Sequence, residues 1–238
     1  MKFDPARMRD GEFVDVDFSE ARFRNVNLHG TRVMEAFLLN ARFSGMIDGL
    51  VINDVEVAPL IEAELNRRYP ERANLTPVTA DGMRAAWSVI EELWARTRER
   101  ASGFPEAALH ERVDGEWSFV ETLRHLVFVT DLWISDPVLG RVGHYHPFAL
   151  PPTFMTNTER FGVDLTADPS AAEAIAARED RMSVVRKLVS GVTDGELDRS
   201  CGEHQVQSCL RTVSNEEWHH NWYANRDLDT LARPHRPA

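Results

Sequence analysis

The chain is poor in the features that define several common classes of protein. It has only 2 cysteines among 238 residues, which excludes a disulfide framework as the basis of the fold. Its formal charge of −11 argues against nonspecific nucleic-acid binding and against attraction to an anionic membrane surface, because both need basic residues. No apolar run approaches the roughly 20 residues that span a bilayer, and the first residues contain no hydrophobic signal core. We therefore expect a cytoplasmic protein that binds neither nucleic acid nor membrane.

The first part of the chain has a five-residue repeat. Large apolar residues recur at every fifth position, and small or β-branched residues stand two positions before most of them. Neither the period of a helix nor that of a strand gives this spacing. The repeating large residues are Phe13, Phe18, Phe23, Leu28, Val33, Leu38 and Phe43. The repeat resembles that of the pentapeptide-repeat family, which implies a short right-handed quadrilateral β-helix over roughly residues 11–54.

This segment is short for a repeat fold. It provides about two coils, whereas stacked repeats need neighbours and caps to be stable. We therefore treat residues 1–57 as one domain that packs on the rest of the chain or mediates a homodimer.

The rest of the chain, residues 58–238, has the periodicity of helices. Ser118 followed by Glu121 has the form of a capping box at the start of one of them. Residues 140–166 contain three prolines and predict an extended crossover. Apolar residues at helical spacing predict the main helices near residues 80–102, 118–136, 169–191 and 210–231, with a shorter one near 60–69. The sequence thus predicts a mainly α fold, a four-helix bundle preceded by the short β-helix.

The last predicted helix carries two potential metal ligands on one face. Glu216 and His220 are four residues apart, so their side chains emerge on the same side. His125, in an otherwise apolar stretch, can provide a third ligand from another helix. Two imidazoles and one carboxylate suit a divalent cation and leave positions open for water or substrate. The sequence predicts a metal site of His125, Glu216 and His220, with zinc as the first choice and nickel or iron as alternatives.

Alternatives remain for these residues. Glu217 lies on the same apolar stripe and could replace Glu216 as a ligand. His125 could instead only hydrogen-bond a backbone carbonyl or Glu216. Either way, buried acids and imidazoles are costly unless they are paired or bind a metal. Trp218 and Trp222 lie on the opposite side of the helix, where we expect them to pack on the β-helix or on a second subunit.

Two motifs resemble the DinB superfamily. They are GEWSFVETLRHL at residues 115–126 and EEWHHNWYANRDL at residues 216–228. That family is a four-helix bundle holding a divalent metal, commonly through three histidines. In its mycothiol-dependent maleylpyruvate isomerase branch the ligands are His, Glu and His, with Glu and His four apart. The resemblance covers about residues 80–231. It implies His125, Glu216 and His220 as ligands and a transferase or isomerase reaction with a low-molecular-weight thiol. Because Glu216 stands where many members carry histidine, the identity of the metal stays open.

Further polar residues are weaker candidates. Arg226 could orient an anionic substrate, or form a surface ion pair. His144 and His146 lie in the crossover, which we expect to cover the mouth of the bundle, and they could contact substrate. The segment CGEHQVQSC at residues 201–209 could hold a soft metal, although no fourth ligand stands nearby. There is no phosphate-binding glycine loop and no Gly-x-Ser-x-Gly nucleophile elbow.

Two functions from different classes follow from these patterns. One is a metal-dependent enzyme acting on a small-molecule substrate, with a thiol as the expected reactant. The alternative is a non-catalytic metal-bearing scaffold, or a protein-interaction module built on the five-residue repeat. Acidic residues only slightly outnumber basic ones in residues 1–57, which weakens a role as a nucleic-acid mimic.

Overall fold

The chain forms two compact units, Met1–Arg42 and Phe43–Ala238. The computed structural model describes residue 8 and residues 10–233. The division falls earlier than the domain boundary predicted at residue 57, because a small hairpin at residues 51–56 groups with the helical unit.

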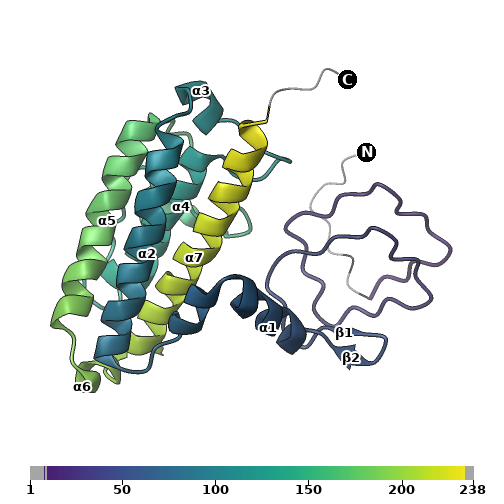
Figure 1. Cartoon of the computed structure of the whole chain (residues 1–238), viewed down its shortest axis with the longest axis horizontal. Helices are drawn as coiled ribbons and strands as arrows, with labels where there is room; N and C mark the ends of the chain where they lie inside the picture. Colours follow the sequence, from purple (N-terminus) through teal and green to yellow (C-terminus); the bar gives the residue numbers. More distant parts are fainter. Residues whose placement is uncertain (1–7, 9, 234–238) are drawn as a thin grey trace. The chain divides into compact units, whose positions relative to one another are not determined.

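The backbone of the first unit repeats every five residues. Left-handed φ angles recur at every fifth position, at Asp10, Asp15, Glu20, Asn25, Gly30, Glu35 and Asn40. Turn hydrogen bonds recur every tenth residue: the Ala21 and Thr31 amides each donate to the carbonyl three residues earlier, at 3.0 Å. Figure 1 shows this part of the chain winding in coils. Strands among the described residues occur only in two hairpins outside this unit, so the quadrilateral β-helix stays a prediction.

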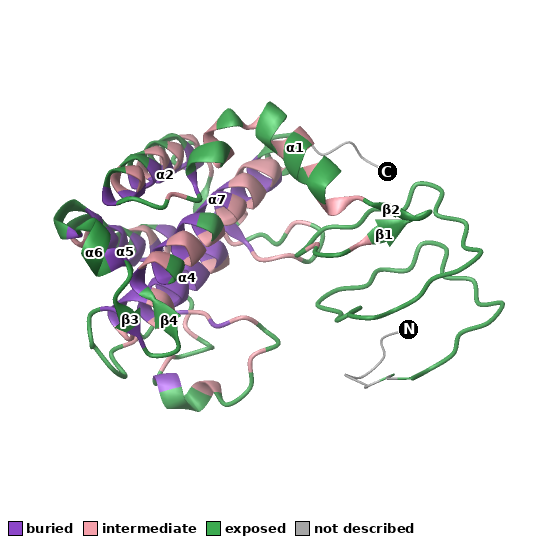
Figure 2. Cartoon of the chain, turned by 90° about the horizontal axis from the view of Figure 1, so that it is seen from below, coloured by how far each residue is buried: buried purple, intermediate pink, exposed green. Residues whose placement is uncertain are grey.

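The second unit is built on four long helices that lie side by side (Figure 1). They are α2 (Ala80–Ala101), α4 (Phe119–Thr130), α5 (Ala171–Gly191) and α7 (Val206–Leu231). Both α2 and α4 pack against α5 and α7. Their inward faces carry the buried residues (Figure 2), including Ile90, Trp94 and Leu123. The prediction of a mainly helical fold is therefore confirmed. No helix in the described part of the chain is long and apolar enough to cross a bilayer.

Short elements join the long helices. An antiparallel hairpin precedes α1, and a second one leads directly into α7. The long connection between α4 and α5 holds only one 3₁₀ turn, η3, in agreement with the predicted extended crossover. The short elements are β1 (Val51–Ile52), β2 (Val55–Glu56), α1 (Ala58–Arg68), the 3₁₀ turn η1 (Pro70–Asn74), α3 (Glu106–Leu109), η3 (Thr158–Phe161), α6 (Asp194–Leu197), β3 (Ser200–Cys201) and β4 (His204–Gln205).

The predicted ligands lie on α4 and α7, and local sequence explains where each of these helices begins. Ser118 and Glu121 form the predicted capping box at the start of α4. After Thr130 this helix continues as a π-helical turn, η2 (Asp131–Ser135), up to the predicted stop. Helix α7 begins at Val206 rather than near residue 210, because the extended Gln205 of β4 enters the helix with no intervening loop.

Candidate metal centre

Helices α4 and α7 bring His125, Glu216 and His220 together. One ligand atom from each residue lies within 4.8 Å of the other two. Nε2 of His220 is 3.3 Å from a carboxylate oxygen of Glu216, and Nε2 of His125 is 3.9 Å from the same oxygen. Two ligand atoms that each bind a tetrahedral ion at about 2.1 Å lie roughly 3.4 Å apart. The two distances to Glu216 are close to this value, whereas the two imidazoles, within 4.8 Å of each other, would have to draw together to share one ion.

The site lies at the edge of the bundle rather than in its centre. The His125 side chain is only 6% exposed, and that of His220 is 14% exposed. The Glu216 side chain is 38% exposed, because it lies beside the buried stripe of α7 rather than on it. One side of the site is thus closed by protein, and solvent reaches the other through Glu216.

The charges at the site favour the forms that bind metals. Burial would raise the pKa of Glu216, but the two neighbouring imidazoles outweigh it and hold that pKa far below its ordinary value. Burial lowers the pKa of His220, against an opposing effect of Glu216. At neutral pH the site thus offers a carboxylate and a neutral imidazole, the protonation states required of ligands.

His125 uses its two ring nitrogens differently. Its Nδ1 lies 3.0 Å from the main-chain oxygen of Leu150. Because a carbonyl can only accept, Nδ1 carries the hydrogen, which leaves Nε2 as the nitrogen that faces Glu216. His125 can therefore bond a backbone carbonyl through Nδ1 and act as a ligand through Nε2, so the two predicted roles are compatible.

Glu217 is kept apart from this cluster. Its side chain is fully buried and forms an ion pair with the buried Arg178 of α5. Burial raises the pKa of Glu217 in spite of this pairing. The carboxylate that faces the imidazoles is that of Glu216, so the structure gives the alternative ligand Glu217 no support.

Aromatic rings line the protein side of the site. The Trp117 ring lies 4.5 Å from the His125 ring and stacks 6.0 Å from the His220 ring. The Tyr223 ring meets His220 edge-on at 6.0 Å. Sequence reasoning assigned no role to either residue. Tyr223 stands three residues after His220, a helical spacing that could have indicated it.

The structure does not bring the other predicted site residues to the cluster. Arg226 pairs with Glu116 at 2.6 Å and Asp227 at 2.7 Å, so its guanidinium is engaged in ion pairs. In the crossover, His146 accepts a hydrogen bond from a nearby main-chain amide, and His144 is exposed. Substrate binding by these three residues stays a prediction.

The partner expected for the two tryptophans of α7 was wrong. Tyr69, at the end of α1, meets Trp218 and Trp222 with ring centroids 5.5 Å and 6.2 Å away. The Arg72 guanidinium lies 4.7 Å over the Trp218 ring. The α1–η1 segment of the same unit therefore covers this face of α7. This packing could not be predicted from the sequence, because the short α1 has no strong apolar stripe of its own.

Cys201 and Cys209 meet away from the candidate metal centre. Their sulfur atoms lie 3.5 Å apart, and both residues are buried. Burial, with the neighbouring thiol, raises the pKa of Cys209 to about 12. The His204 ring packs on Trp133 instead. Among the described residues these groups do not converge as a metal-binding set.

The fold and the cluster define a class of protein: a four-helix bundle with a candidate metal centre between two of its helices. A family model of the DinB superfamily matches residues 89–224, more than half of the chain and all three clustered residues. The chain belongs to the DinB superfamily. Searches of curated proteins and of solved structures gave no match.

Proposed function

We propose that this protein is a metal-dependent enzyme in which His125, Glu216 and His220 bind one divalent ion. Zinc is the first choice, with nickel or iron as alternatives. The convergence of three donor atoms within 4.8 Å carries the proposal, and metal binding is typical of the superfamily. The exposure of Glu216 supports a catalytic rather than a closed structural site, because a substrate needs access to the ion.

The proposed substrate is a small molecule that reacts with a low-molecular-weight thiol, in a transfer or an isomerisation. The His, Glu, His order, with Glu and His four apart, supports this assignment through its resemblance to the mycothiol-dependent branch. A divalent ion held here would lower the pKa of a bound thiol or water. Trp117 and Tyr223 would keep water from the closed side, while Glu216 faces the side from which a substrate arrives.

Metal content measured by elemental analysis tests the site. The parent protein and the variants His125→Ala, Glu216→Gln and His219→Ala are each loaded with zinc and dialysed. His219 is the matched control, since it neighbours His220 but bonds the main-chain oxygen of Asn215. We expect about one equivalent of metal in the parent and the control, and loss in the other two. A parent that retains no metal after loading would refute the proposal.

A second candidate function, for the first unit, is that of an interaction segment. Every residue from 10 to 46 is exposed, including the large apolar residues of the five-residue repeat. Phe18 lies with its ring 6.1 Å from that of Phe13 and 5.5 Å from that of Phe23, so successive members of the series contact one another. Exposed apolar groups in contact with one another favour a protein partner. We propose a pentapeptide-type coil that pairs two copies of the chain.

The homodimer is tested by light scattering after size-exclusion chromatography. We expect a dimeric parent that becomes monomeric in Phe18→Asp. Val14→Asp is the control, because Val14 is exposed but stands outside the five-residue series. A monomeric parent would refute the homodimer and leave the metal site untouched.

A further inference from the structure

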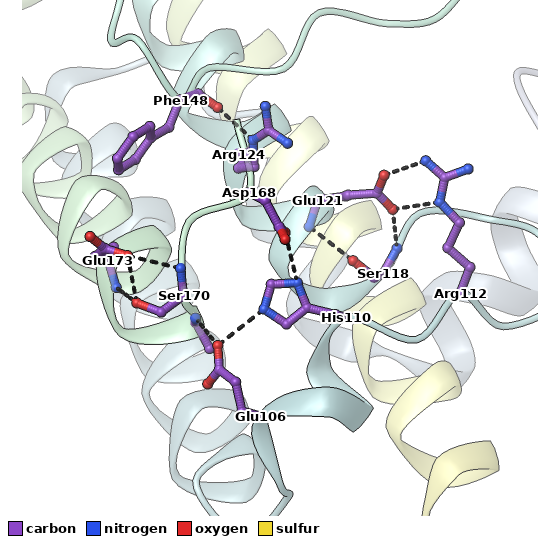
Figure 3. Close-up of polar contacts among 11 residues, drawn as sticks. Glu106, His110, Arg112, Ser118, Glu121, Arg124, Phe148, Asp168, Ser170 and Glu173 are labelled. Atoms are coloured by element: carbon purple, nitrogen blue, oxygen red, sulfur yellow. Dashed lines mark hydrogen bonds and ion pairs between the residues drawn. The ribbon is translucent and has the colours of Figure 1, made fainter. Parts of the chain in front are cut away.

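Arg124, the residue before His125, ties the long crossover to α4. Its Nε donates to the main-chain oxygen of Phe148 at 2.8 Å, as Figure 3 shows, and its Nη2 donates to that of Asp164 at 3.1 Å. The Leu150 amide in turn donates to the main-chain oxygen of Arg124 at 3.1 Å. One buried residue thus fixes two stretches of crossover that lie far apart in sequence.

The same part of the crossover is packed as well as hydrogen-bonded. Ala149 is fully buried, and the Asp164 amide donates to the Pro147 carbonyl at 2.9 Å. Leu150 precedes Pro151, which restricts its backbone to extended conformations. The crossover and the helices beneath it share a separate apolar cluster of Val127, Phe128, Ala149, Phe161 and Ala177. The main-chain oxygen of Leu150 is therefore held in a fixed direction.

That direction is towards His125, whose Nδ1 lies 3.0 Å from the Leu150 oxygen. We infer that Arg124 is a positioning residue: by holding the crossover, it keeps the hydrogen of His125 on Nδ1 and leaves Nε2 free to act as a ligand. Partners that orient a ligating histidine in this way contribute to metal affinity. That this tautomer serves metal binding rests on the proposed function. That His125 carries its hydrogen on Nδ1 does not.

The chemistry of Arg124 fits this role better than a general role in stability. It is buried, and its hydrogen-bonded acceptors are main-chain oxygens rather than carboxylates. Burial accordingly lowers the pKa of Arg124, with only partial compensation from more distant acids. A buried cation without a carboxylate in contact is costly. Its planar guanidinium, however, donates to the two carbonyls from two different nitrogens held in a fixed fork, a geometry that the single ammonium nitrogen of lysine does not reproduce.

Nitrogen-15 NMR of the imidazoles in the metal-free protein tests the inference, because it distinguishes the two neutral tautomers. The protein is held above pH 8, where an ordinary imidazole is neutral. In the parent we expect the His125 hydrogen on Nδ1. In Arg124→Met we expect a mixture with the Nε2–H form, and in Arg124→Lys a smaller shift in the same direction. The matched control is Arg84→Met, since Arg84 also donates to two main-chain carbonyls, those of Val189 and Val192.

Zinc affinity gives the second readout. We expect Arg124→Met to bind zinc roughly 10- to 100-fold more weakly than the Arg84→Met control. An Nε2–H tautomer in the parent, or an unchanged tautomer in a folded Arg124 variant, would overturn the inference. If Arg124→Met does not fold, the tautomer is measured in Arg124→Lys instead. A parent with the expected tautomer but no zinc binding would refute the proposed function alone.

Discussion

Arg178 and Glu217 form an ion pair that is removed from solvent between α5 and α7. In a buried pair of this kind, the attraction between the charges offsets the free-energy cost of their desolvation only while both partners are present. It also holds Glu217 against α5, away from the histidines. Glu216, the preceding residue of α7, is the acid that faces His125.

Removal of either partner should destabilise the fold strongly. We expect Arg178→Met to lower the free energy of unfolding by about 3–5 kcal/mol, because it leaves an uncompensated buried carboxylate. The double variant Arg178→Met/Glu217→Leu should lose less than the two single variants together. Urea unfolding monitored by circular dichroism measures these differences.

The exposed pair of Arg186 and Glu91 is the control for this comparison. Arg186→Met should cost about 1 kcal/mol or less, since solvent screens the pair. Single and double variants that add without coupling would contradict a paired role for Arg178 and Glu217.

At the residue scale, the sequence was sufficient to predict which three residues meet. The four-residue spacing of Glu216 and His220 fixes their shared face, and His125 is conspicuous in an apolar stretch. Glu217 remained an alternative to Glu216, because its pairing with Arg178 is a contact between two helices that lie far apart in sequence. The partner of the His125 Nδ1 is a main-chain oxygen, which side-chain patterns do not reveal.

At the scale of elements, the start of α4 combines two capping contacts. The Glu121 amide donates to the Ser118 hydroxyl at 3.2 Å, and the Ser118 amide donates to the Glu121 carboxylate at 2.9 Å (Figure 3). Arg112 donates to the same carboxylate at 2.8 Å. Burial would raise the pKa of Glu121, but these hydrogen bonds lower it overall.

Loss of the cap should destabilise the protein in a pH-dependent way. Ser118→Ala should lower the free energy of unfolding by about 1 kcal/mol, because it leaves an orphan amide. Ser190→Ala, in an exposed part of α5, should have little effect. Glu121 has a pKa below its ordinary value of 4.5, so its charge stabilises the fold fully above pH 4.5, and this benefit is lost as the pH falls from 4.5 through the lowered pKa. The difference between the parent and Glu121→Gln should therefore shrink below pH 4.5 in urea titrations, and a constant difference would contradict this account.

The elements themselves were largely predictable. Helical periodicity indicated the long helices, and the Ser118–Glu121 spacing marked the start of α4. The π-helical turn at residues 131–135 was not predictable, because its sequence continues the helical pattern of α4. Nor was the packing of α1 on Trp218, which depends on a tertiary contact through Tyr69.

At the scale of the whole molecule, the ligands and the apolar core belong to the second unit. Both apolar clusters lie within residues 43–238, as do His125, Glu216 and His220. The first unit contributes no buried residue in its described part. The five-residue repeat was visible in the sequence, but a repeat cannot predict what covers its exposed apolar residues.

Deletion of residues 1–42 should therefore leave the helical unit folded. We expect the shortened chain to melt within about 4 °C of the parent, a shift that corresponds to roughly 1–2 kcal/mol for a domain of this size. It should also retain the zinc stoichiometry of the parent. Thermal denaturation by circular dichroism and elemental analysis measure the two properties. Loss of zinc with an unchanged melting temperature would indicate that the first unit contributes to the site.

The anchored crossover has a consequence for how the sequence can vary. Connections without regular structure usually tolerate insertions and proteolytic cuts. Between His146 and Leu150 the backbone is instead hydrogen-bonded to the side chains of Asp131, Arg124 and His125. A single inserted residue there would move the Leu150 carbonyl away from the His125 ring. Gly140 and Arg141 still bond the main-chain oxygens of Asp136 and Ser135, so length variation and cleavage should concentrate at the exposed residues 142–144.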